Sequence, residues 1–168
     1  MQKYSFKRLK KILFLTAARM QMPGHLRTKF IRLGGGVNIP DITNVSIGEG
    51  CIIDRLYPEN LTIGHHARIT MNCVILTHYF DTSYKGLRFK TGKVQIEDYV
   101  FLGTGTSICS PVVIGKHSVV GAGSVVTKNI PPYEIWAGNP ARFIKVRPGY
   151  EKEHDEWLQQ NHYVLEYV

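Results

Sequence analysis

The stretch VVIGKHSVVGAGSVVTKNIPP, from Val112 to Pro132, carries an aliphatic residue at every sixth position. A strand repeats every two residues and a helix every 3.6, so neither element alone explains a period of six. The period extends upstream without a missed step through Ile96, Leu102, Ile108, Ile114, Val120 and Val126. A short period that is kept this strictly is typical of a solenoid.

Each six-residue unit has the composition of a short strand followed by a corner. The residue two positions before each later aliphatic is small or β-branched, and residues two apart on a strand share a face, so we expect both to point inward. Glycine follows the aliphatic at Gly103, Gly115 and Gly121, where we expect it to adopt positive φ at a sharp corner. Three units then close a triangular coil of roughly 18 residues, which predicts an all-β parallel β-helix rather than an open sandwich.

The period returns upstream in shorter runs, which two inserts separate. Ile47 and Ile53 form one run, and Ile63, Ile69 and Ile75 form the next. The first insert is DRLYPEN at 54–60, and the second is a loop over 77–94. A regular coil has no place for either insert, so both are expected to loop out, and loops on a rigid scaffold often carry function.

Three regions follow from this pattern. Residues 1–33 form an N-terminal helical arm, residues 34–147 form the coil domain, and residues 148–168 form a tail in which EKEHDEWLQQ predicts a short helix. The cysteines are odd in number and show no CxxC spacing, which indicates reduced thiols in a cytoplasmic protein: Cys51, Cys73 and Cys109. Cys109 follows a core isoleucine and is expected to pack.

The N-terminal arm holds the whole charge excess of the chain, whose net charge is +8. No acidic residue precedes Asp41, whereas the same segment carries nine Lys and Arg. Its apolar residues fall at the spacing of an amphipathic helix that breaks near Pro23: Phe6, Leu9, Leu13, Ala17 and Met20. The arm either caps the open first coil, which we favour because it leads straight into the coil, or makes peripheral contact with an anionic membrane surface.

Three stretches resemble the hexapeptide-repeat acetyltransferases, most of all the maltose and galactoside acetyltransferases and the O-acetyltransferases of surface-polysaccharide clusters. They are LGGGVNI at 33–39, NLTIGHHARITMNCVILTH at 60–78, and IEDYVFLGTGTSICSPVVIGKHSVVGAGSVVTKNIPPYEIWAGNPARFIKVR at 96–147. The resemblance implies a left-handed β-helix, although parallel crossovers are right-handed in about 98% of cases. It also implies a homotrimer with sites at the subunit interfaces, with acetyl-CoA as cosubstrate and no metal.

His78 stands where the repeat breaks into the second insert. The residues alone leave open an ordinary loop histidine, but the resemblance places the family's catalytic base here. A histidine suits removal of an alcohol proton during acetyl transfer. No GxSxG nucleophile motif is present, so we expect direct transfer without an acyl-enzyme.

The resemblance assigns further roles. A backbone amide near Gly103 and Thr104 would stabilise the oxyanion. Asp54 would bind the acceptor or orient His78, and Asn72 would bind the acceptor or satisfy the backbone at a corner. Coenzyme A would contact Phe101, Gly103, Thr104, Ala122, Thr127, Lys128, Arg142 and Lys145. The last three cations would face its phosphates, unless they are ordinary surface charges.

The predicted function is acetyl transfer to a sugar hydroxyl, in a small saccharide or a building block of a surface polysaccharide. A xenobiotic acetyltransferase and a non-catalytic assembly module remain as alternatives, and no nucleic-acid partner is expected. A zinc γ-carbonic anhydrase is rejected, because that family uses three histidines with two of them five apart. Here Cys73 stands five before His78 and Ser83 five after it.

Overall fold

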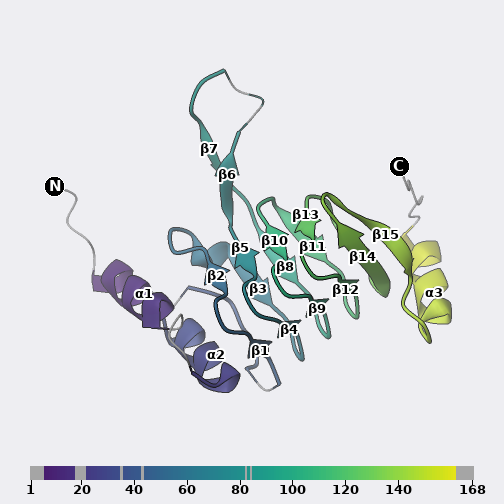
Figure 1. Cartoon of the computed structure of the whole chain (residues 1–168), viewed down its shortest axis with the longest axis horizontal. Coiled ribbons are helices and arrows are strands. Elements are labelled where there is room, and N and C mark those ends of the chain that lie inside the picture. The colour runs from purple at the N-terminus through teal and green to yellow at the C-terminus, as the bar shows by residue number, and fades with distance from the viewer. Residues whose placement is uncertain are drawn as a thin grey trace.

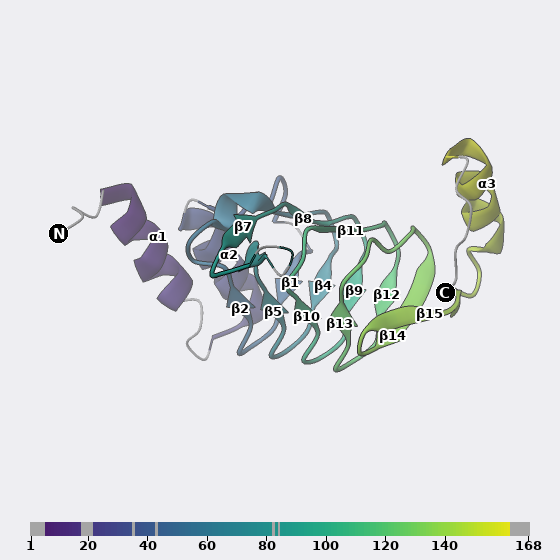
Figure 2. The same ribbon diagram turned by 90° about the horizontal axis from the view of Figure 1, so that it is seen from above.

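The computed structural model of the chain describes residues 6–17, 22–34, 36–42, 44–81, 83 and 85–161. The chain passes through three parallel faces in turn, so that strands adjacent on a face come from successive coils (Figures 1 and 2). The first face consists of β3 (Leu61–Ile63), β8 (Val94–Ile96) and β11 (Val112–Ile114). The second consists of β1 (Ser46–Ile47), β4 (Arg68–Ile69), β9 (Phe101–Leu102), β12 (Val119–Val120), β14 (Glu134–Gly138) and the antiparallel β15 (Ala141–Val146). The third consists of β2 (Ile52–Ile53), β5 (Val74–Ile75), β10 (Ser107–Ile108) and β13 (Val125–Val126).

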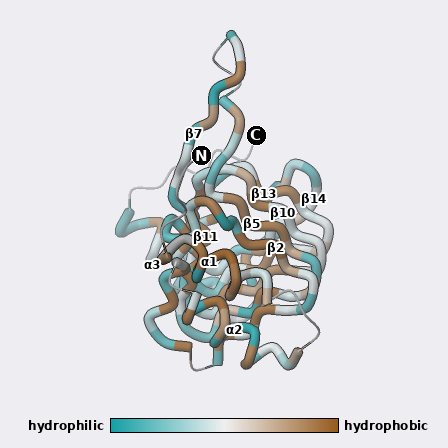
Figure 3. The backbone as a smooth tube through the Cα atoms, turned by 90° about the vertical axis from the view of Figure 1, so that its left-hand side faces the viewer, coloured by the Kyte–Doolittle hydropathy of each residue, from teal (hydrophilic) through white to brown (hydrophobic). Residues whose placement is uncertain are grey.

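The register stacks the aliphatic residues of the repeat on one another inside the coil. On the first face, Ile63 lies beside Ile96, and Ile96 lies beside Ile114. The aliphatic residues of the other two faces are paired in the same way. All six members of the run from Ile96 to Val126 are at most 1% exposed. Burying a side chain of this size contributes about 1.5–3 kcal/mol. The hydrophobic colour in Figure 3 accordingly concentrates on strands such as β2, β5 and β10.

The prediction that the glycine after each aliphatic adopts positive φ is wrong. Positive φ occurs three residues after the aliphatic, at the corners that end the first and second faces: Gly50, His66, Asn72, Tyr99, Gly105, His117, Gly123 and Tyr133. The glycine directly after the aliphatic serves close packing instead. A Cβ on Gly103 would lie 2.5 Å from the backbone nitrogen of Ala122, and one on Gly115 would lie 2.5 Å from that of Pro132.

Both inserts leave the coil at the corner between the third and first faces. The first insert contains the short 3-10 helix η1 (Pro58–Asn60). The second forms an antiparallel hairpin of β6 (His78–Phe80) and β7 (Phe89–Thr91), which stands away from the coil (Figure 1). Because β2 and β5 pair in register, the two inserts begin side by side in consecutive coils.

Helices lie at the two ends of the coil (Figure 2). The arm contains α1 (Phe6–Ala17) and α2 (Gly24–Leu33), and α3 (Glu151–Asn161) confirms the helix predicted in the tail. Within α2, Arg27 donates from Nη1 to the Ile47 carbonyl at 3.0 Å, and Thr28 donates to the Val45 carbonyl at 3.3 Å. Capping of the first coil is therefore confirmed for α2.

The capping prediction is wrong for α1, whose contact is with α2. The rings of Phe14 and Phe30 lie 5.8 Å apart between centroids. Three apolar side chains of α1 are exposed, Phe6 by 83%, Leu9 by 58% and Leu13 by 65%. The predicted helical position Met20 lies outside the described residues. None of the helices in the described parts of the chain is long and apolar enough to cross a membrane.

Candidate active site

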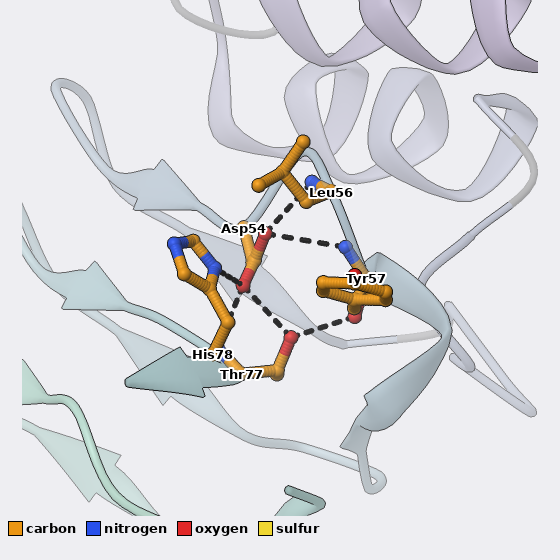
Figure 4. A network of polar contacts seen from close by, with 5 residues as sticks. All are labelled: Asp54, Leu56, Tyr57, Thr77 and His78. Carbon is orange, nitrogen blue, oxygen red and sulfur yellow. Dashed lines mark hydrogen bonds and ion pairs between the residues drawn. The ribbon is translucent and has the colours of Figure 1, made fainter. Parts of the chain in front are cut away.

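The two inserts bring Asp54 and His78 into direct contact. Asp54 follows β2, and His78 begins β6, three residues after the last residue of the neighbouring strand β5. Nδ1 of His78 lies 2.6 Å from Oδ2 of Asp54 (Figure 4). The Asp54 side chain is fully buried, whereas the His78 side chain is 26% exposed. The pair therefore has a buried acidic end and an accessible imidazole.

Backbone and hydroxyl groups hold the Asp54 carboxylate in place. Oδ1 accepts from the amides of Leu56 at 2.7 Å and Tyr57 at 3.2 Å. Oδ2 accepts from the Thr77 amide at 2.9 Å, and the Thr77 hydroxyl lies 2.9 Å from the same oxygen. Burial raises the pKa of Asp54, but the hydrogen bonds from His78, Thr77 and Leu56 outweigh it and lower the pKa to about 2. Asp54 is therefore ionised at neutral pH.

This ionisation determines which nitrogen of His78 carries the proton. An ionised carboxylate only accepts hydrogen bonds, so Nδ1 must be the donor in the contact with Asp54. In the neutral imidazole, Nε2 is then the unprotonated nitrogen, and it points away from Asp54 in Figure 4. A histidine held in this way can take a proton from a hydroxyl group, and the carboxylate stabilises the imidazolium that forms.

A cavity of about 730 Å³ lies between the hairpin and the coil, with His78 in its wall. Phe80, Phe89, Lys90 and Cys109 also line it. Cys109 is exposed, so the prediction that it packs is wrong. It sits just past β10 at the corner from which the inserts leave, where the residue after the aliphatic faces outward. Desolvation raises the pKa of its thiol, which favours the neutral form.

Two aromatic rings lie close to the histidine. The rings of Tyr57 and Phe89 each lie 6.3 Å from the His78 ring between centroids, and both are inclined at 61°. Tyr57 also accepts a hydrogen bond from the Thr77 hydroxyl at its carbonyl, at 2.7 Å. Sequence reasoning did not single out Tyr57 or Thr77. The available signal was their position, in the first insert and directly before the histidine.

An ion pair braces the hairpin beside the cavity. Asp81 accepts from the Ser83 hydroxyl at 2.6 Å and lies 2.9 Å from Nζ of Lys90. The hydrogen bond from Ser83 and then that from Lys90 lower the pKa of Asp81 to about 2. Lys90 therefore lines the cavity with its ammonium group paired to the Asp81 carboxylate.

The remaining predicted residues are divided between two corners of the triangle. Thr127 and Lys128 follow β13 and are exposed at the corner where His78 stands, two coils further along. Asn72, Thr104 and Ala122 are exposed at the corner between the second and third faces. Within one copy of the chain, the structure does not bring this second group to His78.

One of these predictions changes with the structure. The Gly103 amide donates to the Val120 carbonyl at 2.8 Å, so it is not free to stabilise an oxyanion and that prediction is wrong. The Thr104 amide stays a prediction. Asn72 has a φ of 58°, and its backbone amide donates to the Glu49 carbonyl at 2.8 Å. Acceptor binding by its side chain stays a prediction.

Of the predicted coenzyme residues outside these two groups, Phe101, Arg142 and Lys145 are on the surface, whereas Gly103 is buried. Phe101 is 41% exposed on the second face. Arg142 and Lys145 are exposed on β15, where Arg142 donates to the Ala141 carbonyl at 3.1 Å. Their cationic groups are thus accessible to an anionic ligand.

The resemblance to the hexapeptide-repeat transferases is confirmed by comparison with known proteins. The family described as bacterial transferase hexapeptide (six repeats) matches residues 93–128. A galactoside acetyltransferase in complex with coenzyme A superposes with a TM-score of 0.64 at 23% identity, over 99% of this chain and 88% of that one. A maltose O-acetyltransferase from Clostridium difficile 630 gives a TM-score of 0.61 at 25% identity, over 83% and 86%.

Sequence relatives match over the repeat region. The mitochondrial gamma carbonic anhydrase 2 of Arabidopsis thaliana is 33% identical over 121 residues, which are 68% of this chain and 36% of the relative. The Bacillus subtilis protein named "Putative acetyltransferase YvoF" is 37% identical over 91 residues, which are 54% of this chain and 51% of the relative. The chain thus spans about a third of the first relative and about half of the second.

The likeness to a carbonic anhydrase prompts a test of the metal donors. Across the described ranges, no group of three or more His, Cys, Asp and Glu side chains is placed to hold a metal ion. The histidine of the candidate site has its Nδ1 on Asp54 and two aromatic rings close to it. These residues do not fit a three-histidine zinc site within one copy of the chain.

Proposed function

We propose that the chain is an acetyl-CoA-dependent O-acetyltransferase that acts on a sugar hydroxyl, with His78 as the general base. The observation that carries the proposal is the Asp54–His78 pair, in which Nδ1 is held by Asp54, Nε2 is unprotonated, and the histidine lines a cavity of about 730 Å³. The fold supports it, because a galactoside and a maltose acetyltransferase share that fold.

In the proposed reaction the hydroxyl proton moves to Nε2 of His78 as the oxygen attacks the thioester carbonyl. The tetrahedral intermediate then collapses, the carbon–sulfur bond breaks, and the imidazolium returns the proton to the leaving sulfur. The products are the acetyl ester and coenzyme A with a free thiol. Asp54 stays ionised throughout and stabilises the imidazolium.

The sugar acceptor is supported by the aromatic surroundings of His78. Tyr57 is 42% exposed and Phe89 is 68% exposed, so both rings have accessible surface beside the base. A flat apolar surface beside polar groups suits the alternating faces of a saccharide ring. We place this saccharide among the small sugars or the building blocks of a surface polysaccharide.

We further propose a homotrimer of left-handed coils in which coenzyme A lies in a groove between two copies. A groove of this kind would join the corner of His78 on one copy to the corner of Thr104 and Ala122 on the next. Lys128, Arg142 and Lys145 would then meet the phosphates of the coenzyme, and Phe101 would contact its pantetheine arm. A cytoplasmic location belongs to the same proposal and agrees with free thiols at all three cysteines.

The test is an acetylation assay of the purified chain with a panel of sugars, nucleotide sugars and xenobiotics as acceptors. Turnover is measured as release of the free thiol of coenzyme A. His78→Ala is expected to lower kcat by at least about 100-fold and leave the Kd for acetyl-CoA nearly unchanged. His25→Ala, an exposed histidine on α2, is the matched control and should keep full turnover.

Each rival gives a different result. Absence of acetyl-CoA binding by the wild-type chain would favour an assembly module, and turnover on xenobiotics alone would favour drug inactivation. Retention of turnover by His78→Ala would place the base elsewhere.

A further inference from the structure

Helix α1 turns its apolar side away from the rest of the protein. At about 100° per residue, Phe6, Leu9 and Leu13 fall within an arc of about 60°. These side chains are 83%, 58% and 65% exposed, respectively. Phe14 lies outside that arc and packs on α2, with its ring 5.8 Å from that of Phe30. The arc (Phe6, Leu9 and Leu13) therefore faces away from α2, and α1 extends beyond α2 at the end of the molecule (Figure 2).

The coil does not need this apolar arc as a cover. The end of the first coil is already closed by α2, which buries Arg27, Thr28 and Ile31. A row of large apolar side chains on the outside of a protein marks an interaction surface. The arc of α1 thus has a role other than capping.

The charge of the same segment identifies the partner. The helix sequence FKRLKKILFLTA holds four basic residues and no acidic one. The surrounding chain adds to this charge, since nine Lys and Arg and no Asp or Glu precede Asp41. A nucleic acid would neutralise these cations but leave the arc in water, and an apolar groove of another protein would cover the arc but make no use of the cations.

A bilayer that contains anionic lipid satisfies both features at once. Apolar side chains of a surface helix enter the boundary between headgroups and acyl chains, while Lys and Arg remain at the anionic headgroups. With 12 residues, α1 is about 18 Å long, which suits lying on the surface rather than crossing it. We propose that α1 docks this protein on an anionic lipid bilayer through Phe6, Leu9 and Leu13. The proposal does not depend on the proposed catalysis.

The test is co-sedimentation of the full chain with vesicles. Vesicles of phosphatidylcholine with phosphatidylglycerol are compared with vesicles of phosphatidylcholine alone, each at low and high salt. Binding is expected only to the anionic vesicles, and it should weaken at high salt because exposed charges are screened. Leu9→Glu should reduce the binding constant by about tenfold or more, because it removes apolar contact and adds a repelling charge.

The matched control is Leu33→Glu on α2. Leu33 and Leu9 are both 58% exposed, and the two substitutions change the net charge equally. Leu33→Glu should retain most of the binding if the arc of α1 is the docking surface. Equal losses in both variants would mean that charge alone drives binding, and this would overturn the proposal.

Two further outcomes would also overturn it. Wild-type protein that stays in the supernatant with anionic vesicles at low salt does not dock on such a surface. A decrease in oligomer mass in Leu9→Glu, but not in Leu33→Glu, would show that the arc packs between copies of the chain.

Discussion

The Asp54 carboxylate decides what His78 can do, and both residues obtain their geometry from the coil. They are 24 residues apart in sequence, yet their contact is 2.6 Å because β2 and β5 lie in register on one face. Four groups besides His78 contact the carboxylate, so its charge and orientation are fixed before any substrate binds. Such preorganisation suits the proposed role of Asp54, which is to position His78 as a general base.

The low pKa of Asp54 predicts a pH-dependent contribution to stability. Its folded pKa of about 2 lies below the ordinary value of 3.8, so ionised Asp54 stabilises the fold above about pH 4. At about 1.4 kcal/mol for each pKa unit, this contribution is about 2 kcal/mol near neutral pH. It is lost as the pH falls from about 4 towards 2. Denaturant unfolding at a series of pH values should show Asp54→Asn less stable at neutral pH, with the gap closing over that range.

Glu156→Gln is the control for this measurement, because Glu156 is an exposed acid on α3 with a weak contact to Lys152 at 3.9 Å. Its stability should follow that of the wild type at every pH. If the gap between Asp54→Asn and the wild type is the same at pH 3 and pH 7, the hydrogen bonds do not hold the carboxylate ionised.

Sequence reasoning identified His78 and Asp54, but not the residues that hold them in place. His78 stands at a break in the repeat, and the matching coil indicated Asp54. Tyr57 and Thr77 carry no motif, and their roles follow from the path of the first insert. The Gly103 amide failed as an oxyanion donor because its partner, the Val120 carbonyl, is set by the pairing of coils.

At the scale of elements, the period of six determined the faces of the coil but not its corners. Positive φ falls three residues after the aliphatic, where the chain carries His, Asn and Tyr as well as Gly, so no glycine pattern marks it. At the corner that ends the first face, the side chains of the residues with positive φ stack on one another, and this contact offsets the backbone strain. The His66 and Tyr99 rings lie 4.5 Å apart, and those of Tyr99 and His117 4.6 Å apart, close to the spacing between strands.

The N-terminal arm was predicted to act as one unit, with a single break near Pro23. The structure separates its two helices by burial, with Ile31 of α2 only 3% exposed and Leu9 of α1 58% exposed. The hairpin of β6 and β7 was expected as a loop, since its residues interrupt the period of six. The difference between α1 and α2, and the pairing of β6 with β7, arise from contacts between residues far apart in sequence, which a local sequence pattern does not reveal.

Capping by α2 predicts unequal effects of two substitutions in the same helix. Ile31→Ala should lower the free energy of unfolding by about 2–4 kcal/mol, because it leaves a cavity over the first coil. Leu33→Ala should change it by less than about 0.5 kcal/mol, since Leu33 is 58% exposed. Urea unfolding of both variants measures the difference. Similar values for the two would mean that α2 does not close the coil in solution.

For the whole molecule, the predicted trimer depends on a surface that one copy leaves open. Outward residues of the third face stand in register, and most are apolar: Ile52, Val74, Ser107 and Val125. The outward residues of the first face are more polar: Thr62, Gln95 and Val113. An apolar row on one face of a repeat is suited to contact with another copy.

Val125→Arg should therefore dissociate the trimer, because three copies would place cations in one apolar contact. Val113→Arg introduces the same side chain at an outward valine of the first face and should leave the mass in light scattering unchanged. The proposed coenzyme groove joins two copies, so Val125→Arg should also weaken acetyl-CoA binding and lower turnover, and the three losses should occur together. A wild-type chain that is monomeric at micromolar concentration would contradict the trimer. Full coenzyme binding by monomeric Val125→Arg would instead place the coenzyme within a single copy.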